Sequence, residues 1–208
     1  MPLRRDSHRF TTVRMRLRAL GLAAVVLPLA LAGQEPPRAV AAQASNAVAR
    51  TFLSFGRPYG GWLLMAFDSI PASSYGFRPT PVQQSVGHIA QHLEDANYGL
   101  CSQFGVTRHV MTAKDSLADT VKALWPKDTL VARVRASLEF CVAAIRGLSD
   151  ASLADTLRVD TPSGPIAVLR TRYLLLLVTD LAEHYSQLSN YMRLLGLVPP
   201  SALAPPRR

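Results

Sequence analysis

The feature that most constrains the fold is a long apolar segment near the end of the chain, at residues 170–196, with the sequence RTRYLLLLVTDLAEHYSQLSNYMRLLG. It opens with an apolar run at residues 174–178. Further apolar side chains follow at spacings of mostly three and four residues, at Leu181, Leu188, Tyr191, Met192 and Leu195. This periodicity predicts one long helix with a buried face. Gly196 marks its end, and the pair Pro199-Pro200 prevents continuation.

Three polar side chains, Asp180, Glu183 and His184, lie in the middle of this apolar helix. Asp180 and His184 are four residues apart, so they lie one turn apart on the same face. A carboxylate and an imidazole on an apolar helix need a partner, and a metal ion, a buried ion pair or solvent would each supply one. The sequence leaves these three interpretations open.

The same periodicity predicts three further long helices. They span residues 47–70, residues 81 or 85 to 104, and residues 127–147. The first is expected to be interrupted near Pro58, which suits a first turn better than a helix interior, so that its firm part is residues 58–69.

Two shorter elements connect these helices. A short helix is expected at residues 113–124, and alternating apolar positions at residues 151–168 predict a small β-hairpin or an extended crossover. The predicted fold class is therefore all-α: an up-down four-helix bundle with one long crossover and a short hairpin before the last helix.

The beginning of the chain has the three parts of a secretory signal peptide. Six arginines precede an apolar stretch at residues 19–32, which closes in the cleavage pattern Ala30-Leu31-Ala32. The stretch is short for a transmembrane helix. We therefore expect cleavage, export to the periplasm or the exterior, and no stable membrane insertion afterwards; an uncleaved N-terminal anchor is the alternative.

The predicted organisation of the chain follows from this leader and from the helices. Residues 1–32 are the signal peptide and residues 33–46 a linker rich in Ala, Pro and Gln. Residues 47–200 form the bundle, and residues 201–208 form a flexible tail.

The basic character of the chain comes largely from the leader. The formal net charge is +9 for the whole sequence and falls to +4 without residues 1–32, which hold six arginines and one aspartate. The remaining basic residues are scattered singly, without a Lys/Arg run or interleaved aromatic residues. This distribution argues against a nucleic-acid partner.

The two cysteines, Cys101 and Cys141, fall on different predicted helices. In an oxidising compartment they would form a disulfide that joins these helices. Two buried free thiols are the alternative, and the sequence does not decide between them.

The second predicted helix also carries metal-ligating residue types, because His88 and His92 are four residues apart and share a face. The facing helices of a bundle can assemble a metal site from histidines and carboxylates. Such ligands suit Zn²⁺, Ni²⁺, Fe²⁺ or Mn²⁺, and three of them leave a coordination position open for water or substrate. The chain contains no HEXXH motif, no G-x-S-x-G motif and no Gly-rich phosphate loop.

Two segments resemble the DinB superfamily of four-helix bundles, which includes YfiT-like proteins. They are YGFRPTPVQQSVGHIAQHLEDANYGLC at residues 75–101 and DLAEHYSQLSNYMRLLGLVPPS at residues 180–201. The resemblance extends over roughly residues 47–201. It implies a metal ion between the second and fourth helices, held by one histidine of the second helix and by an H-x-x-x-H pair of the fourth.

The resemblance assigns the metal ligands of this chain as His92, Asp180 and His184. His92 begins the matching stretch HLEDANY, and His184 matches the second histidine of the last helix. Asp180 stands where the family has the first histidine of the pair. An aspartate can still bind a divalent ion, and it favours harder metals than a third histidine would; its presence can equally mean that the site has decayed.

The resemblance also suggests a range of functions. Characterised members include metal-dependent transferases and isomerases that use small thiols, so a metal-dependent thiol transferase or hydrolase acting on a small molecule is the first expectation. A non-catalytic metal-binding, ligand-binding or structural bundle is the alternative, and the sequence leaves open whether the chain is an enzyme. Relatives often form homodimers, and the sequence leaves open whether this chain does. His88 is expected as an accessory group or a surface residue. Glu183 is expected to be solvated or to form an interhelical pair, and a contact with a metal ligand is the alternative.

Overall fold

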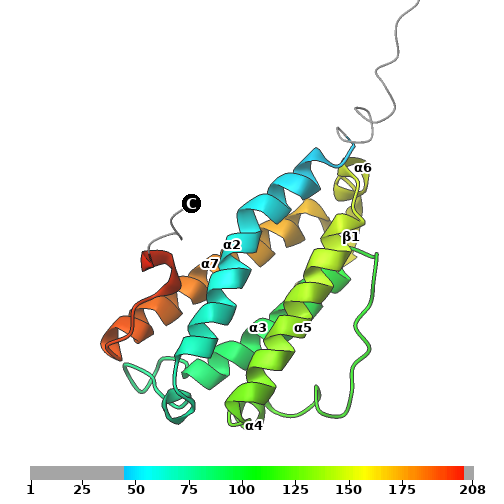
Figure 1. The fold of residues 1–208 in the computed structure, drawn as a ribbon. Helices are drawn as coiled ribbons and strands as arrows, with labels where there is room; N and C mark the ends of the chain where they lie inside the picture. Colours follow the sequence, from blue (N-terminus) through cyan, green and yellow to red (C-terminus); the bar gives the residue numbers. More distant parts are fainter. Residues whose placement is uncertain (1–44, 204–208) are drawn as a thin grey trace, which may run out of the picture. The chain divides into compact units, whose positions relative to one another are not determined.

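The computed structural model describes residues 45–203. The predicted signal peptide, nearly all of the predicted linker and the last five residues lie outside the described residues. Four long helices make up most of the described part: α2 (Ala47–Ser69), α3 (Val86–Ser102), α5 (Lys127–Arg146) and α7 (Thr171–Leu194) (Figure 1). The predicted helical bundle is therefore confirmed.

The four helices form a square in which α2 packs against α5 and α7, and α3 packs against the same two helices. The neighbours α3 and α5 run parallel, since Gly87 faces Leu130 near their beginnings and Cys101 is bonded to Cys141 further along. The long crossover at residues 103–126 makes this possible, because it carries the chain from the end of α3 back to the level of its beginning (Figure 1).

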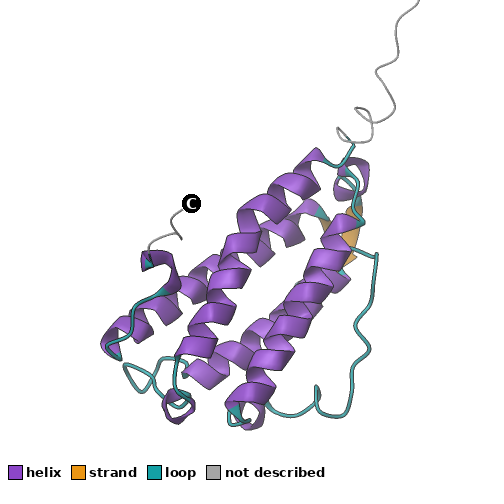
Figure 2. Cartoon of the chain, viewed as in Figure 1, coloured by secondary structure: helices purple, strands orange, loops and turns teal. Residues whose placement is uncertain are grey.

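A short hairpin precedes the last helix, as predicted (Figure 2). After the short helix α6 (Asp150–Leu153), strand β1 (Thr156–Val159) pairs antiparallel with β2 (Ile166–Leu169). Gly164 in its turn has a φ of +106°, a conformation that favours glycine. Two 3₁₀ helices complete the described part, η1 (Ala72–Ser74) and η2 (Pro200–Ala202).

The core lies between the four helices and is apolar. Its fully buried side chains come from each of them, for example Leu63, Phe67, Ile89, Leu93, Leu130, Val134, Leu174, Leu188 and Met192. Their spacing of three and four residues along each helix is the periodicity seen in the sequence. None of the helices in the described range is long and apolar enough to span a membrane.

The interruption expected near Pro58 is wrong, because α2 continues through Pro58 without a break. Proline removes one backbone hydrogen bond from a helix interior. Contacts with α7 on both sides of the proline compensate for this loss: Gly56 faces Val178, and the ring of Trp62 lies 5.2 Å from that of Tyr185.

The short helix expected at residues 113–124 is reduced to α4 (Asp119–Lys122). The helix begins only at Asp119 because Ala118 before it is extended, with a ψ of 141°. In the preceding segment, the carboxylate of Asp115 accepts a hydrogen bond from the backbone N–H of Thr112 and pairs with Arg133, which fixes this part of the crossover on α5.

Local hydrogen bonds fix the beginning of α3 and the end of α7. Ser85 caps α3, since its side chain accepts a hydrogen bond from the backbone N–H of His88. Gly196 follows α7 with a φ of +74°, where the N–H of Leu197 reaches the carbonyl of Met192. The boundary expected for the flexible tail at Ser201 falls inside η2, where the N–H of Ser201 donates to the Tyr185 hydroxyl.

Candidate metal centre

His92 of α3 faces Asp180 and His184 of α7. The buried residues Ile89, Ala90 and Leu93 fix the inward face of α3, and His92 lies at the edge of that face. On α7, Leu177 and Leu181 are buried beside Asp180 in the same way. The apolar periodicity of both helices thus places the polar side chains along the line where α3 and α7 meet.

The ligand atoms of these three residues converge, since all lie within 4.8 Å of one another. Nε2 of His92 is 3.4 Å from Oδ1 of Asp180, and the rings of His92 and His184 are stacked with their centroids 4.8 Å apart. The structure therefore brings together the three residues that the sequence assigned.

The hydrogen bond of His184 determines which of its ring nitrogens is available. Its Nδ1 lies 2.9 Å from the backbone carbonyl oxygen of Asp180. A carbonyl oxygen only accepts, so Nδ1 carries the hydrogen and Nε2 keeps its lone pair. Metal-binding histidines are commonly oriented in this way, by a hydrogen bond from the other ring nitrogen.

Asp180 has one oxygen without a hydrogen-bond partner. Its Oδ2 is buried and accepts no hydrogen bond within the described part of the chain. A buried carboxylate oxygen normally has a partner, because leaving one unsatisfied is costly. The orphaned oxygen points to a cation or donor that this carboxylate is shaped to accept.

Solvent reaches the cluster mainly from the side of α3. The side chain of His92 is 38% exposed, whereas those of Asp180 and His184 are 20% and 9% exposed. The hydrogen bond with Asp180 raises the pKa of His92; burial acts in the opposite direction, and nearby carboxylates raise it further. A proton on His92 would therefore compete with a metal ion for this candidate ligand.

His88 and Glu183, the other two polar residues considered in the sequence, lie outside this cluster. His88 contributes its backbone N–H to the cap of α3, and Glu183 is exposed as expected. Tyr98 stacks on His109 of the crossover with ring centroids 3.6 Å apart. Tyr185 packs against Trp62.

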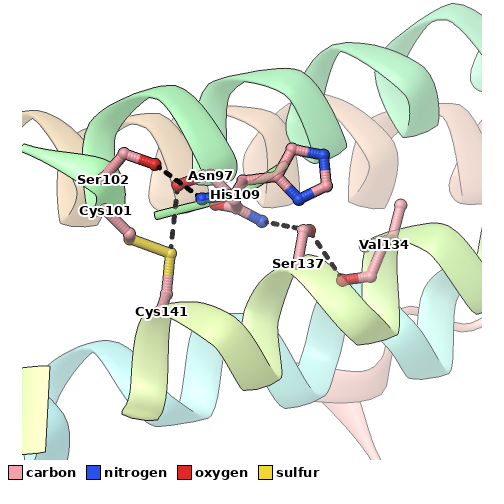
Figure 3. Close-up of a disulfide and its surroundings, with 7 residues drawn as sticks. All are labelled: Asn97, Cys101, Ser102, His109, Val134, Ser137 and Cys141. Carbon is pink, nitrogen blue, oxygen red and sulfur yellow. Dashed lines mark hydrogen bonds between the residues drawn. A yellow bond between two sulfur atoms is a disulfide. The ribbon is translucent and has the colours of Figure 1, made fainter. Parts of the chain in front are cut away.

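The two cysteines form a disulfide, which settles the alternative that the sequence left open (Figure 3). It joins the end of α3 to α5, with the Cα atoms of Cys101 and Cys141 5.3 Å apart. Beside it, the side chain of Asn97 donates to Ser137 at 2.9 Å, so a second contact joins the same two helices.

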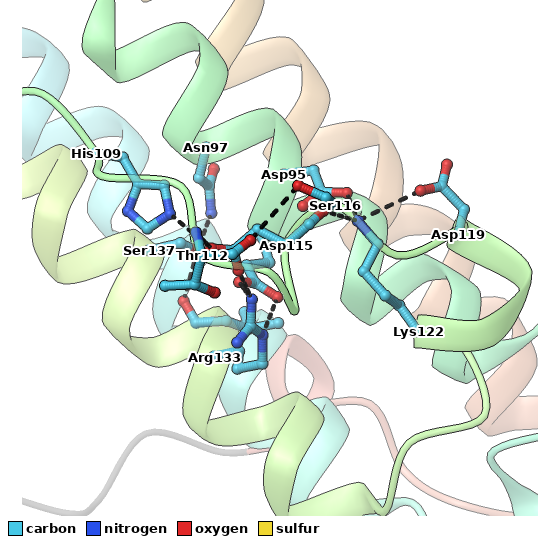
Figure 4. Close-up of polar contacts among 12 residues, drawn as sticks. Asp95, Asn97, His109, Thr112, Asp115, Ser116, Asp119, Lys122, Arg133 and Ser137 are labelled. Atoms are coloured by element: carbon cyan, nitrogen blue, oxygen red, sulfur yellow. Dashed lines mark hydrogen bonds and ion pairs between the residues drawn. The ribbon is translucent and has the colours of Figure 1, made fainter.

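A buried ionic network beneath the crossover was not predicted (Figure 4). Arg133 of α5 pairs with Glu94 of α3 and with Asp115 of the crossover, and both carboxylates are nearly inaccessible to solvent. Burial raises the pKa of Glu94. At Asp115, the hydrogen bonds from Thr112 and the charge of Arg133 outweigh burial and hold the pKa well below its usual range.

A second part of this network lies near the candidate metal centre, since the charges of Asp95 and Asp119 act on His92. The ammonium group of Lys122 pairs with Asp95 of α3 and with Asp119, and the side chain of Lys122 is only 2% exposed. Asp95 and Glu94 belong to the stretch HLEDANY, which is part of the resemblance to the family. Their cationic partners, Lys122 and Arg133, lie 27 and 39 residues further along the chain. No local pattern links residues so far apart.

Comparison with known families supports the resemblance seen in the sequence. The sequence model of the DinB superfamily matches residues 62–188. The chain belongs to the DinB superfamily. Among curated proteins, no sequence matches this superfamily member.

Solved structures share the fold of this DinB-superfamily chain. A DinB-like protein from Bacillus cereus ATCC 10987 aligns with a TM-score of 0.56 and 19% identity, over 72% of this chain and 93% of its own. A conserved protein from Enterococcus faecalis aligns with a TM-score of 0.53 and 15% identity, over 71% and 96%. At such identities the likeness concerns the fold alone.

An enzyme is also among the similar structures. The mycothiol-dependent maleylpyruvate isomerase aligns with a TM-score of 0.52 and 14% identity. The alignment covers 67% of this chain and 59% of the isomerase, so a large part of that enzyme has no counterpart here.

Proposed function

We propose that this DinB-superfamily chain is an exported protein that binds a divalent metal ion between α3 and α7. His92, Asp180 and His184 would hold the ion, and its chemistry would be thiol transfer or hydrolysis of a small molecule. The convergence of the three ligand atoms within 4.8 Å is the observation that carries the proposal.

The residues present fit a metal ion. Ligands at 2.0–2.1 Å from a tetrahedral ion lie about 3.3 Å apart, and the His92–Asp180 separation of 3.4 Å matches this spacing. The donor set of two imidazoles and one carboxylate is common for Zn²⁺ and for non-haem Fe²⁺. The unpartnered Oδ2 of Asp180 and the available Nε2 of His184 fit the same role.

The two histidines would have different roles: one would fix the position of the site, and the other would lie on the side from which a substrate approaches. His184 is held by its hydrogen bond to α7 and is nearly buried, so it would fix the position of the site. His92 is the most exposed of the three, so a substrate would approach from its side. When bound, the ion would lower the pKa of a thiol or of a water molecule and so supply a nucleophile near neutral pH.

A thiol is proposed as co-substrate because the isomerase that shares this fold is mycothiol-dependent. That likeness is one of fold, so thiol transfer is a class of reaction to be tested. A non-catalytic metal-binding bundle is the second candidate. It is favoured by Asp180, which stands where the resemblance places a histidine.

Export is proposed from the leader and is supported by the disulfide. Structural disulfides persist in oxidising compartments and are rare in the cytosol, and Cys101 and Cys141 are joined here. Expression with and without residues 1–32, followed by fractionation, tests this part. Retention of the full chain in the cytoplasm would contradict it.

The metal site is tested by loading the purified protein with Zn²⁺, Ni²⁺ or Mn²⁺ and measuring bound metal after dialysis. The wild-type protein is expected to retain close to one ion per chain. His184→Ala should weaken binding by about 100-fold or more, since it removes a ligand. Glu183→Ala is the matched control, because Glu183 is the exposed neighbour of His184 and should bind as the wild type does. Equal retention by both variants would refute the site.

Catalysis is tested separately, with glutathione, bacillithiol or mycothiol and an electrophilic acceptor. The metal-loaded wild type should form the conjugate faster than His184→Ala does. If the two rates are equal while the wild type alone retains metal, the chain is the non-catalytic metal-binding bundle.

A further inference from the structure

We infer that a groove between α2 and α5 binds a small amphipathic anion, namely a single-chain carboxylate with an apolar tail. The lining of the groove comes from α2, α5 and α7 and includes none of His92, Asp180 and His184. No residue of α3 contributes to it. The groove is therefore a site separate from the candidate metal centre, and the inference does not depend on metal binding.

The groove is large enough for such a ligand and has an apolar interior. Its volume is about 1140 Å³, slightly above the usual range of about 300–1,000 Å³ for small-molecule sites. The apolar lining includes Leu64, Leu138, Val142, Leu177, Val178 and Leu181. The groove runs along α2 from Ala47 to Leu64, a length of about 26 Å at 1.5 Å per residue. An extended alkyl chain fits a groove of this shape.

Small residues of α2 create the hollow. Gly56, Gly60 and Gly61 all line the groove. A Cβ atom at Gly60 would lie 3.3 Å from Leu138, which is tight, whereas one at Gly61 would meet nothing within 4 Å. Gly61 is exposed and lines the groove, so a larger side chain at this position would cover part of the groove.

The charge around the groove is strongly positive. Four arginines line it, Arg50, Arg57, Arg135 and Arg146, together with a single glutamate, Glu139. Arg135 pairs with Asp68 at 3.7 Å. Within the described part of the chain, the other three arginines form no ion pair. Arginine suits carboxylates because its guanidinium can donate two parallel hydrogen bonds.

Two of these arginines lie at the same end of the groove. Because α2 and α5 are antiparallel and Gly60 faces Leu138, Arg50 is level with the end of α5 and so with Arg146. Asp150, a carboxylate at this end of the bundle, accepts a hydrogen bond from the N–H of Val48 at the beginning of α2. A ligand with its tail among the leucines and its head between Arg50 and Arg146 would satisfy both parts of the groove.

The binding experiment is titration calorimetry of the purified protein with dodecanoate, below its micelle concentration. One ligand per chain is expected, and each methylene added between decanoate and tetradecanoate should tighten binding about fourfold. Dodecyltrimethylammonium has the same chain with a positive head and should bind at least about tenfold more weakly. Equal affinity for both heads would refute the anion site.

Matched variants locate the ligand in the groove. Gly61→Leu fills the open space and should lower affinity by about tenfold or more. Gly99→Leu is its control, because Gly99 is an exposed glycine of α3 whose Cβ would also meet nothing within 4 Å. Arg50→Gln combined with Arg146→Gln should weaken binding about fivefold, whereas Arg172→Gln, on α7 outside the groove, should not. If Gly61→Leu binds as the wild type does, the inference is wrong.

Two further outcomes would assign the groove to another occupant. If the protein self-associates without ligand and Gly61→Leu abolishes this in sedimentation experiments, the occupant is a second copy of the chain. If dodecanoate binds only when presented in anionic vesicles, the face contacts a membrane surface. Either result overturns the inference. His184→Ala should keep full dodecanoate affinity, so failure of the metal proposal would leave this result unchanged.

Discussion

Nε2 of His92 and Oδ1 of Asp180 lie 3.4 Å apart, although 88 residues separate them along the chain. The contact joins the middle of α3 to the middle of α7. It also identifies the point at which this chain departs from the three-histidine pattern that the resemblance implies. In the proposed site, the nature of residue 180 would therefore control which metal ion is bound.

Replacing Asp180 should change the preference for the metal. Asp180→His supplies a third imidazole, and nitrogen ligands favour Zn²⁺ and Ni²⁺ over Mn²⁺. The ratio of the Zn²⁺ and Mn²⁺ dissociation constants, measured by competition with a chelating dye, should shift toward Zn²⁺ by about tenfold or more. Asp180→Ala should weaken the binding of Zn²⁺ and of Mn²⁺ by similar factors. A ratio that does not change in Asp180→His would show that residue 180 is not a ligand.

Because the pKa of His92 is raised, we expect the stability of the metal-free protein to fall and its metal affinity to increase as the pH rises. In the metal-free protein, protonated His92 paired with Asp180 stabilises the fold. This contribution is fully present below about pH 6.5, the usual histidine pKa, and is lost as the pH rises through the raised folded value. A ligand histidine must be neutral, so metal affinity should fall as the pH is lowered through that same value.

Urea unfolding of the metal-free wild type and His92→Gln between pH 5.5 and 8.5 measures the first effect. The difference in unfolding free energy between the two should shrink toward high pH. Glu183→Gln should follow the wild-type curve at every pH. A difference that stays constant across the range would contradict the pairing of His92 with Asp180.

The ionic network should be most sensitive at Arg133. Arg133→Met leaves two buried carboxylates, Glu94 and Asp115, without their partner. Uncompensated buried charges of this kind cost about 3–5 kcal/mol. Arg135→Met is the control on the same helix: its partner Asp68 is more than half exposed, so the loss should stay below about 1 kcal/mol.

Denaturant unfolding at pH 7 distinguishes these two arginine variants. Neutralising the two carboxylates with Glu94→Gln and Asp115→Asn in the Arg133→Met background should recover part of the lost stability, because the orphaned charges are then removed. Similar losses for Arg133→Met and Arg135→Met would show that burial of the network does not matter.

Removal of the disulfide should destabilise the bundle without unfolding it. The bond closes a loop of 40 residues, for which the chain-entropy relation gives about 4 kcal/mol. Thermal unfolding of the variant carrying Cys101→Ser and Cys141→Ser should show this loss. Reductant should lower the stability of the wild type and leave that of the double variant unchanged; a response of both would point to another cause.

The sequence was sufficient to predict the parts of the fold that depend on local pattern. The apolar periodicity of residues 170–196 predicted α7 to within two residues at each end, because Gly196 and the prolines after it end the helix by local chemistry. The three candidate ligands followed from the resemblance, and the structure brings them together. Whether they bind a metal stays a prediction.

The errors concern features that depend on tertiary contacts. Pro58 would break an isolated helix, but α7 packs on both sides of it and α2 continues. The helix expected at residues 113–124 begins only at Asp119, where the extended Ala118 ends. The segment before it is held on α5 by the pair of Asp115 with Arg133, 18 residues further along the chain. The ionic network and the groove between α2 and α5 likewise arise from residues far apart in sequence, and no period of three or four reveals them. The disulfide was one of two alternatives that the sequence left open, and the structure decides for it.

The parallel pairing of α3 with α5 has a consequence for how the molecule would come apart. The disulfide, the Arg133 network and the Asn97–Ser137 contact all fasten this one pair of helices. The candidate ligands instead lie on α3 and α7, and so belong to opposite halves of the square. An ion held by them would crosslink the pair α3 and α5 to the pair α2 and α7, which are otherwise joined mainly by apolar contacts. Hydrogen exchange of the α7 amides should therefore slow far more on metal loading than exchange in α5, which is already bound covalently to its neighbour.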